Sequence, residues 1–200
     1  MASAPAGLAL LERAVGYALA QAVDVTPVQL AYPTPCAGWD LRTLLAHIGD
    51  SARALREAIG SGRVCWVAGP AAEPGDIAPG RRPHPAAAFC AEAGLLLGAC
   101  AVDRTEHHVA IGDRRLTVGL VATTGAIELA VHGWDISAAC GRSRPIRPIP
   151  PELALDLLEV AGLVVNGTTR PGLFGEPLMV PPVACPGDKL VALLGRTPPT

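Results

Sequence analysis

Aromatic side chains are scarce in this chain, and their scarcity restricts the fold. Half of the 200 residues are hydrophobic but only 4% are aromatic, so Ala, Leu and Val must fill the core. Such residues pack closely between helices, whereas β-sandwiches usually recruit aromatic and β-branched side chains. A chain of this length can bury a sizeable core without a disulfide or a metal. We therefore expect an all-α protein.

Periodic apolar residues and capping signals predict six helices. The four long ones cover residues 6–25, 41–59, 85–102 and 119–140, and two shorter ones cover 151–165 and 187–194. Residues 104–118 fit either a small β-hairpin or an extended crossover. This order predicts an antiparallel four-helix bundle over residues 1–143. Residues 144–200 are expected to form a small helical and extended C-terminal cap packed on the bundle.

Charge and cysteine usage exclude several classes of protein. A net charge of −2 and a pI near 6.2 give no general field that attracts nucleic acid or anionic lipid. No apolar run reaches the ~18 residues of a membrane span, and the first eleven residues lack the pattern of a signal peptide. The six cysteines form no C-x-x-C pair, so we expect reduced and mostly buried thiols. These features predict a cytoplasmic monomer or homodimer that binds neither nucleic acid nor membranes.

The residues that most clearly suggest chemistry are two histidines and a glutamate. Glu128 and His132 stand four apart in the predicted helix 119–140, so both project from one face and can converge on a first-row metal. The alternative is a hydrogen-bonded pair on a wetted face. His47 interrupts the apolar stripe of the helix 41–59, where it is either a third ligand or a hydrogen-bonded core histidine. Two histidines and one glutamate would leave coordination positions open, as in a catalytic site.

Other polar residues have two interpretations each. Asp135 follows His132 by three residues and could orient it, or could be an ordinary hydrogen-bonding residue. Cys36 precedes a helix whose dipole could lower the thiol pKa, although a buried inert cysteine is the more common case. Trp39 is expected to be a packing residue. Arg81-Arg82, in the irregular stretch 62–84, could contact an anionic substrate group or remain solvated.

Three segments carry a resemblance to a known family: TPCAGWDL at 34–41 with LLAHI at 44–48, ELAVHGWD at 128–135, and the C-terminal residues from Phe174 to Pro198. They resemble the DinB-like bundle proteins related to the N-terminal domain of mycothiol-dependent maleylpyruvate isomerase, in their short, actinobacterial-type form. In that family the motif histidine of the second helix and the Glu and His of the fourth bind a divalent metal, usually taken as zinc. Carried over by motif, the resemblance implies that His47, Glu128 and His132 bind Zn²⁺.

The resemblance also implies a class of function. Its members include mycothiol-type S-transferases and thiol-dependent isomerases, so it implies a metal-dependent enzyme. Such an enzyme activates a low-molecular-weight thiol as a metal-bound thiolate against an electrophilic substrate. The full isomerase has an additional C-terminal domain, for which the residues after the fourth helix are too few, so the class is implied but not one reaction. The alternative is a non-catalytic metal- or ligand-binding bundle protein with a structural or regulatory role. A fourth protein ligand would favour the structural role, and an open cleft would favour catalysis.

Overall fold

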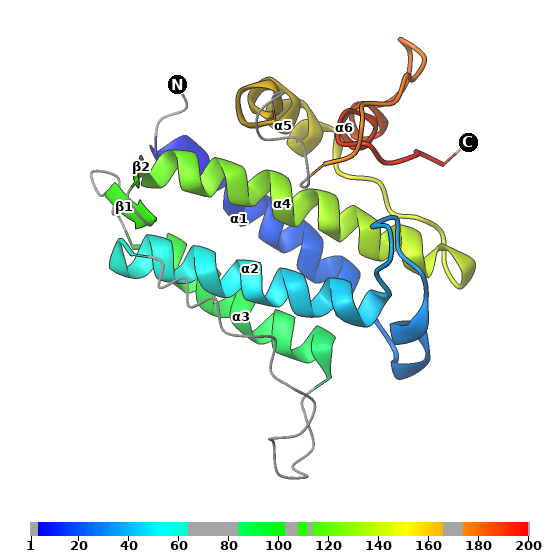
Figure 1. Cartoon of the computed structure of the whole chain (residues 1–200), viewed down its shortest axis with the longest axis horizontal. Coiled ribbons are helices and arrows are strands. Elements are labelled where there is room, and N and C mark those ends of the chain that lie inside the picture. The colour runs from blue at the N-terminus through cyan, green and yellow to red at the C-terminus, as the bar shows by residue number, and fades with distance from the viewer. Residues whose placement is uncertain (1–3, 64–83, 103–107, 112–113, 166–173, 200) are drawn as a thin grey trace.

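The structure is a computed structural model that describes residues 4–63, 84–102, 108–111, 114–165 and 174–199 (Figure 1). These residues are mostly helical, with one small antiparallel sheet. The helices are α1 (Ala4–Ala22), α2 (Leu41–Ser61), α3 (Pro85–Cys100), α4 (Val118–Ala139), α5 (Pro151–Val164) and α6 (Pro186–Leu193), with short 3₁₀ helices η1 (Pro27–Ala31) and η2 (Cys140–Arg142). The strands are β1 (His108–Ile111) and β2 (Arg114–Thr117).

The predicted helical class is confirmed, and the segment before α4 is a hairpin, not an extended crossover. In it His108 pairs with Thr117 and Ile111 with Arg114. The Ala110 N–H donates to the Gly62 carbonyl at 2.9 Å, which attaches the hairpin to the end of α2. No described helix combines the length and apolar composition needed to cross a membrane.

The long helices α1–α4 enclose one apolar core. Helix α1 lies along α4 and α2 lies along α3, while α2 also contacts α4 and α1 contacts α3 (Figure 1). Helix α4 is buried on nearly every side, as its Ala, Val and Ile content predicts. Small residues let α1 and α4 approach closely: a Cβ on Gly133 would lie 3.0 Å from the Cα of Ala18. The core therefore holds α4 rigidly, and α4 carries two of the predicted ligands.

Helix α2 begins at the predicted residue, Leu41, and ends at Ser61, two residues beyond the predicted end. The Asp40 side chain accepts a 2.8 Å hydrogen bond from the Thr43 N–H at the N-terminus. At the other end Gly62 has a φ of 69°, a left-handed conformation that suits glycine. The apolar stripe between these caps is buried against the core. The backbone of His47, which lies at the edge of the stripe, is therefore held in a fixed position.

The first helix ends earlier than predicted. It ends at Ala22 and not at residue 25, and Val23, just beyond it, is 67% exposed. The chain there turns into η1, which the Thr26-Pro27 pair begins. All five described cysteines are free thiols, as expected; Cys100 and Cys140 are buried, Cys36 and Cys90 are half-buried, and Cys185, the N-cap of α6, is exposed. Cys65 lies outside the described residues.

Helices α5 and α6 pack against each other beside the long helices. Helix α5 contacts α1 and α4, and an Arg13–Asp156 ion pair joins it to α1 at the surface. An extended segment, 174–185, leads from the α5 side into α6 (Figure 1). The chain then returns past α6 toward the long helices, where Arg196 is buried.

Candidate metal centre

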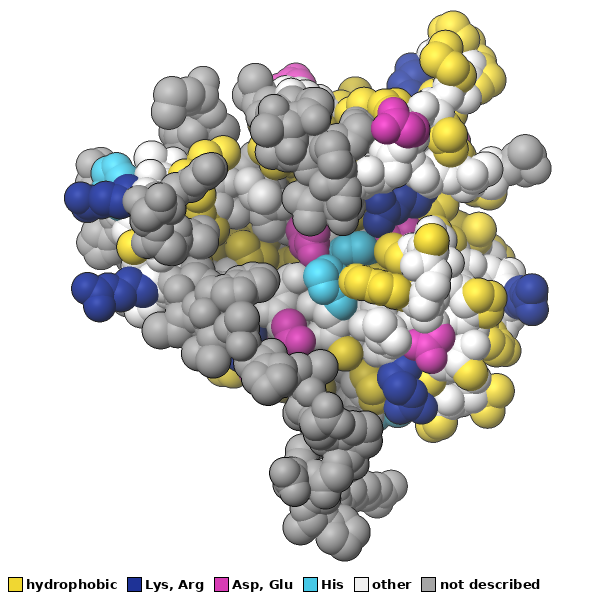
Figure 2. Space-filling view, viewed as in Figure 1, with side chains coloured by type: hydrophobic (Ala, Val, Ile, Leu, Met, Phe, Trp, Pro, Cys, Tyr) yellow, Lys and Arg dark blue, Asp and Glu magenta, His cyan; other side chains and the backbone are white. Residues whose placement is uncertain are grey.

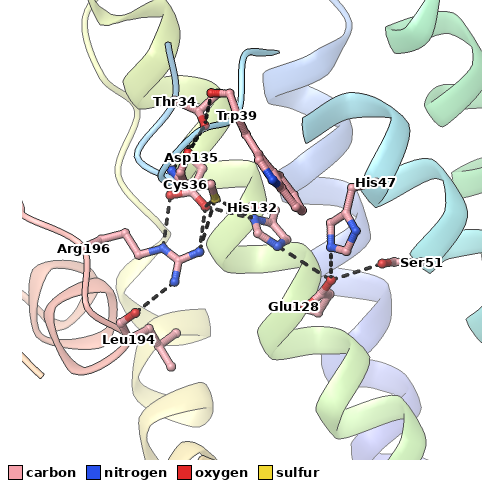
Figure 3. Close-up of polar contacts among 10 residues, drawn as sticks. All are labelled: Thr34, Cys36, Trp39, His47, Ser51, Glu128, His132, Asp135, Leu194 and Arg196. Carbon is pink, nitrogen blue, oxygen red and sulfur yellow. Dashed lines mark hydrogen bonds and ion pairs between the residues drawn. The ribbon is translucent and has the colours of Figure 1, made fainter. Parts of the chain in front are cut away.

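The three predicted ligand residues converge. Helix α2 supplies His47 and α4 supplies Glu128 and His132 (Figure 3). The Glu128 Oε1 atom lies 2.9 Å from His47 Nε2 and 3.7 Å from His132 Nε2. One donor atom from each residue lies within 4.8 Å of the other two, a grouping that could hold one cation. Of the alternatives from the sequence, a hydrogen-bonded pair on a wetted face and a hydrogen-bonded core histidine, the structure shows hydrogen bonding between His47 and Glu128 at a half-buried site.

Helical periodicity explains why these side chains meet. Thr124, Glu128 and His132 are spaced four apart on α4, and all three line one cavity. His47 and Ser51 have the same spacing on α2, and the Ser51 hydroxyl donates to Glu128 Oε1 at 3.1 Å. Ser51 was not predicted, although the i,i+4 argument that links Glu128 to His132 also points from His47 to Ser51.

The site combines burial with partial access to solvent. The side chain of His132 is 8% exposed, that of Glu128 29% and that of His47 38%. Burial raises the pKa of Glu128, but the hydrogen bond from His47, the charges of the two histidines and the Ser51 hydroxyl outweigh it. The result is a pKa lowered from 4.5 to about 2. Glu128 is therefore an ionised carboxylate at neutral pH, the form that binds cations.

Asp135 contacts His132 directly. Its carboxylate, fully buried, has Oδ2 2.9 Å from His132 Nδ1. Burial raises the pKa of Asp135, but the hydrogen bond from His132 and the charge of Arg196 lower it overall, so the group is an ionised acceptor. With an ionised Asp135, Nδ1 of His132 is the nitrogen that donates to the carboxylate, and Nε2 faces Glu128. Histidine ligands of metals usually have such a carboxylate on their second nitrogen.

Two further residues surround Asp135, and sequence reasoning missed one of them. The Arg196 guanidinium reaches both Asp135 oxygens, with Nη2–Oδ2 at 3.1 Å and Nε–Oδ1 at 3.4 Å. The Cys36 thiol donates to Oδ2 at 3.2 Å. Burial and the charge of Asp135 raise the pKa of Cys36 to about 12, although Arg196 opposes them. The lowered pKa considered for Cys36 is therefore wrong: burial of the thiol, and next the Asp135 carboxylate that faces the sulfur, raise the pKa instead.

A cavity of roughly 800 Å³ opens over the three ligand residues, a volume in the range of small-molecule sites. Figure 2 shows histidine and acidic side chains gathered near the middle of this face, between α2 and α4. The cavity walls combine residues of α2, α4 and the connector before α2 with C-terminal residues, which include Phe174, Gly175, Gly195 and Arg196. Arg81 and Arg82 lie outside the described residues.

Trp39 belongs to the cavity wall and is not only a packing residue. Its ring meets that of His47 edge-on at a centroid distance of 4.8 Å and stacks on that of His132 at 6.5 Å. The two histidine rings are themselves perpendicular, 5.2 Å apart. Trp39 therefore restricts how both imidazoles can turn, a role that the sequence alone did not suggest.

The donor atoms suit one cation site better than two. Cys36, His132 and Asp135 form a second close group that shares His132. The Arg196 guanidinium lies 3.6 Å from the Cys36 sulfur and 3.1 Å from Asp135, so a positive charge already occupies this side. Among the described residues, the group of His47, Glu128 and His132 is the one that faces the cavity without a cation beside it. Three protein donors leave room for exogenous ligands.

Comparisons with known proteins identify the family of this chain. Residues 11–137 match the family described as the mycothiol maleylpyruvate isomerase N-terminal domain, and that segment includes all three candidate ligands. Two uncharacterized proteins of Mycobacterium tuberculosis, MT0763 of strain CDC 1551 / Oshkosh and Rv0738 of strain ATCC 25618 / H37Rv, are each 31% identical over 184 residues. The alignments cover 87% of this chain and 88% of each relative. No solved structure matches. The chain belongs to the family of mycothiol maleylpyruvate isomerase N-terminal domains.

Proposed function

We propose that this protein is a metal-dependent thiol-handling enzyme, an S-transferase or a thiol-dependent isomerase that uses mycothiol or a similar low-molecular-weight thiol. The observation that carries the proposal is the convergence of His47, Glu128 and His132 at a cavity large enough for a small-molecule substrate. A site whose only role is structural normally closes with a fourth protein ligand. Among the described residues this group holds three donors, which favours catalysis over the structural alternative.

The donor set fits a divalent cation, and we propose Zn²⁺. Two imidazole nitrogens and one carboxylate oxygen form a ligand set that zinc takes in catalytic sites. His132 is already oriented for this role by Asp135, which holds the proton on Nδ1. A half-buried carboxylate such as Glu128 is also stabilised by a positively charged partner, and a cation supplies one.

Charge balance favours a thiol as the exogenous ligand. The three protein ligands bring one negative charge to a divalent cation, and the nearby charges of Arg196 and Asp135 cancel each other. The centre therefore has a net charge of +1, and a single thiolate neutralises it, which is favourable in an apolar surrounding. When bound, a divalent cation lowers the pKa of a coordinated thiol and so makes the nucleophile available at neutral pH.

The chain positions the reactants in this scheme. In a transfer, the thiol gives its proton to solvent, its sulfur forms a bond to the electrophilic carbon, and the leaving group departs with the electron pair of the bond that breaks. In an isomerisation, the thiolate adds to one carbon of a double bond, whose electron pair moves onto the adjacent electron-withdrawing group; after rotation about the resulting single bond the pair returns and the sulfur leaves as thiolate. Trp39, Ile127 and Phe174 give the cavity apolar walls beside the reacting sulfur, while Ser51 and Asp135 hold Glu128 and His132 in place through hydrogen bonds.

We further propose that residues 1–143 are a DinB-like antiparallel four-helix bundle domain and that residues 144–200 form a cap packed on it. The mutual contacts of α1–α4 around one core support the first part. The contacts of α5 with α1 and α4, and of Arg196 with Asp135, support the second.

Metal analysis tests the proposed site. Protein prepared with excess Zn²⁺ and then desalted should retain about one zinc per chain, and His47→Ala should lose it. His108→Ala is the matched control, since His108 lies exposed on β1. If wild type retains no more zinc than His47→Ala, the assignment of these ligands is wrong.

A transfer assay tests the proposed chemistry. Zinc-loaded protein should accelerate the reaction of mycothiol, or a surrogate thiol, with a generic electrophile, and His47→Ala should not. Cys36→Ser should retain the rate, because the reacting sulfur belongs to the thiol substrate and not to the chain. If Cys36→Ser abolishes turnover while His47→Ala is active, the protein is a cysteine-nucleophile enzyme instead.

A further inference from the structure

Arg196 connects the C-terminal end of the chain to the candidate metal centre. It follows α6 by three residues and lies outside the segment 11–137 that matches the family. Its side chain is only 8% exposed, and its Nη1 donates to the Leu194 carbonyl at 2.9 Å. The remaining contacts of the guanidinium are with Asp135 and Cys36 (Figure 3). An arginine buried in this way has a specific partner, the Asp135 carboxylate.

The Arg196 guanidinium contacts the Asp135 carboxylate at two points. Nε faces Oδ1 at 3.4 Å and Nη2 faces Oδ2 at 3.1 Å, so the planar guanidinium engages both carboxylate oxygens. Such a fork fixes the plane of a carboxylate, which a single hydrogen bond does not. The fixed plane points Oδ2 at His132 Nδ1, 2.9 Å away. The direction of the Asp135–His132 hydrogen bond therefore depends on Arg196.

We propose that Arg196 is a positioning residue of the metal centre: by clamping both oxygens of Asp135 it holds the His132 ring with Nε2 turned toward Glu128 and His47. The expected effect on metal affinity rests on the proposed function. The orientation of the His132 ring does not, because it is a property of the chain itself. This role of Arg196 gives the C-terminal segment a part in a site whose ligands all come from α2 and α4.

The backbone near Arg196 is held independently of the ion pair. Gly195 has a φ of 81°, and a Cβ placed on it would lie 2.5 Å from the Cα of Gly175. These two glycines therefore let segments 174–175 and 194–196 cross in close contact, beside the cavity that both line. Replacing the Arg196 side chain by lysine leaves this crossing intact. The Arg196→Lys variant thus separates the clamp from the docking of the segment.

A double-mutant cycle on zinc affinity tests the inference. Lysine keeps the positive charge but reaches one carboxylate oxygen at a time, so Arg196→Lys should weaken zinc binding by about tenfold, at the lower end of the effects seen for groups that orient ligands. Asp135→Asn should weaken it by about 10- to 100-fold. The double variant should be no weaker than Asp135→Asn, because Arg196 acts through Asp135. Arg13→Lys, in the surface pair with Asp156, is the matched control and should leave affinity unchanged.

The ¹⁵N NMR signals of the histidine rings give a second readout, in metal-free protein. Wild type and Arg13→Lys should show His132 protonated on Nδ1 with a slowly exchanging proton, and Arg196→Lys should lose that slow exchange. If the His132 signals of Arg196→Lys equal those of wild type, or if its affinity loss persists undiminished in the Asp135→Asn background, the inference is wrong. If wild type binds no zinc, the proposed function fails while the ring signals still decide whether Arg196 orients His132.

Discussion

Replacing Glu128 by glutamine should separate the charge of the site from its shape. Glutamine keeps the length of the side chain, and its oxygen can still accept from His47 Nε2 or the Ser51 hydroxyl, which lie 2.9 and 3.1 Å from Glu128 Oε1. The metal-free protein should therefore fold normally. What is lost is the one negative charge that the three candidate ligands bring to the cation.

The size of the effect follows from the charge at ligand distance. A divalent cation about 2.1 Å from a carboxylate oxygen is attracted by about 4 kcal/mol even at the dielectric constant of water, ~80. The amide dipole of glutamine retains part of that attraction, so we expect a loss of about 3 kcal/mol, or roughly 100-fold at about 1.4 kcal/mol per tenfold. The low pKa of Glu128, about 2, means that this charge is fully present at neutral pH.

The assay is a competition for zinc against a chromophoric chelator at pH 7, with folding checked by circular dichroism. Glu92→Gln is the matched control: it removes the same charge from a glutamate that pairs with Arg53 and Arg56 between α3 and α2. Glu128→Gln should bind zinc about 100-fold more weakly than Glu92→Gln, by the estimate from charge and distance. Equal affinities in the two variants would refute the assignment of Glu128 as a ligand.

Three further predictions concern stability and reactivity. In chelator-treated protein, the stability advantage of wild type over Glu128→Gln should be constant above about pH 4.5 and should shrink as the pH falls toward about 2, since the pKa of Glu128 is lowered from 4.5 in the folded state. Denaturant midpoints of both proteins at pH 6, 4 and 3 measure this advantage, and a difference that stays constant would count against the lowered pKa. Iodoacetamide at pH 8 should alkylate the exposed Cys185 before Cys36, whose pKa is raised to about 12, as peptide mass spectrometry can show; earlier labelling of Cys36 would contradict that pKa. Gly195→Ala should unfold more easily by about 1–3 kcal/mol, because its Cβ would lie 2.5 Å from the backbone of the neighbouring segment and its φ is 81°. Gly94→Ala, with open space around it in α3, should gain up to about 1 kcal/mol instead; equal melting temperatures of the two alanine variants would contradict the close crossing.

The helices could be predicted from the sequence because the signals that start, continue and end a helix lie within a few residues of one another. The periodic apolar residues of helix 41–59 and its capping residues act within a few positions of one another, and the helix is confirmed, with its end two residues later than predicted. The spacing between Glu128 and His132 is local in the same way. The meeting of His47 with Glu128, 81 positions away, needed the resemblance to a family as well as the spacing, because no local pattern states which helices are neighbours.

The parts of the site that were missed depend on tertiary contacts. Arg196 lies 61 positions from Asp135, and nothing in its local sequence indicates that it is buried on a carboxylate. Trp39 packs against the core, as expected, but the connector before α2 also places its ring beside those of His47 and His132. For Cys36, the helix dipole was the visible local influence, whereas the buried charge of Asp135 acts on its thiol from α4. Long-range electrostatics of this kind cannot be read from spacing.

The most direct test of the account is whether a small thiol binds the metal held by His47, Glu128 and His132. Protein loaded with Co²⁺ in place of zinc should develop a sulfur-to-cobalt charge-transfer absorption on addition of mycothiol or a surrogate thiol, saturating at one equivalent. The band should be retained in Cys36→Ser and absent in His47→Ala. If wild type shows no band with any small thiol, or if the band is present without added thiol and disappears in Cys36→Ser, the thiol-handling account is contradicted.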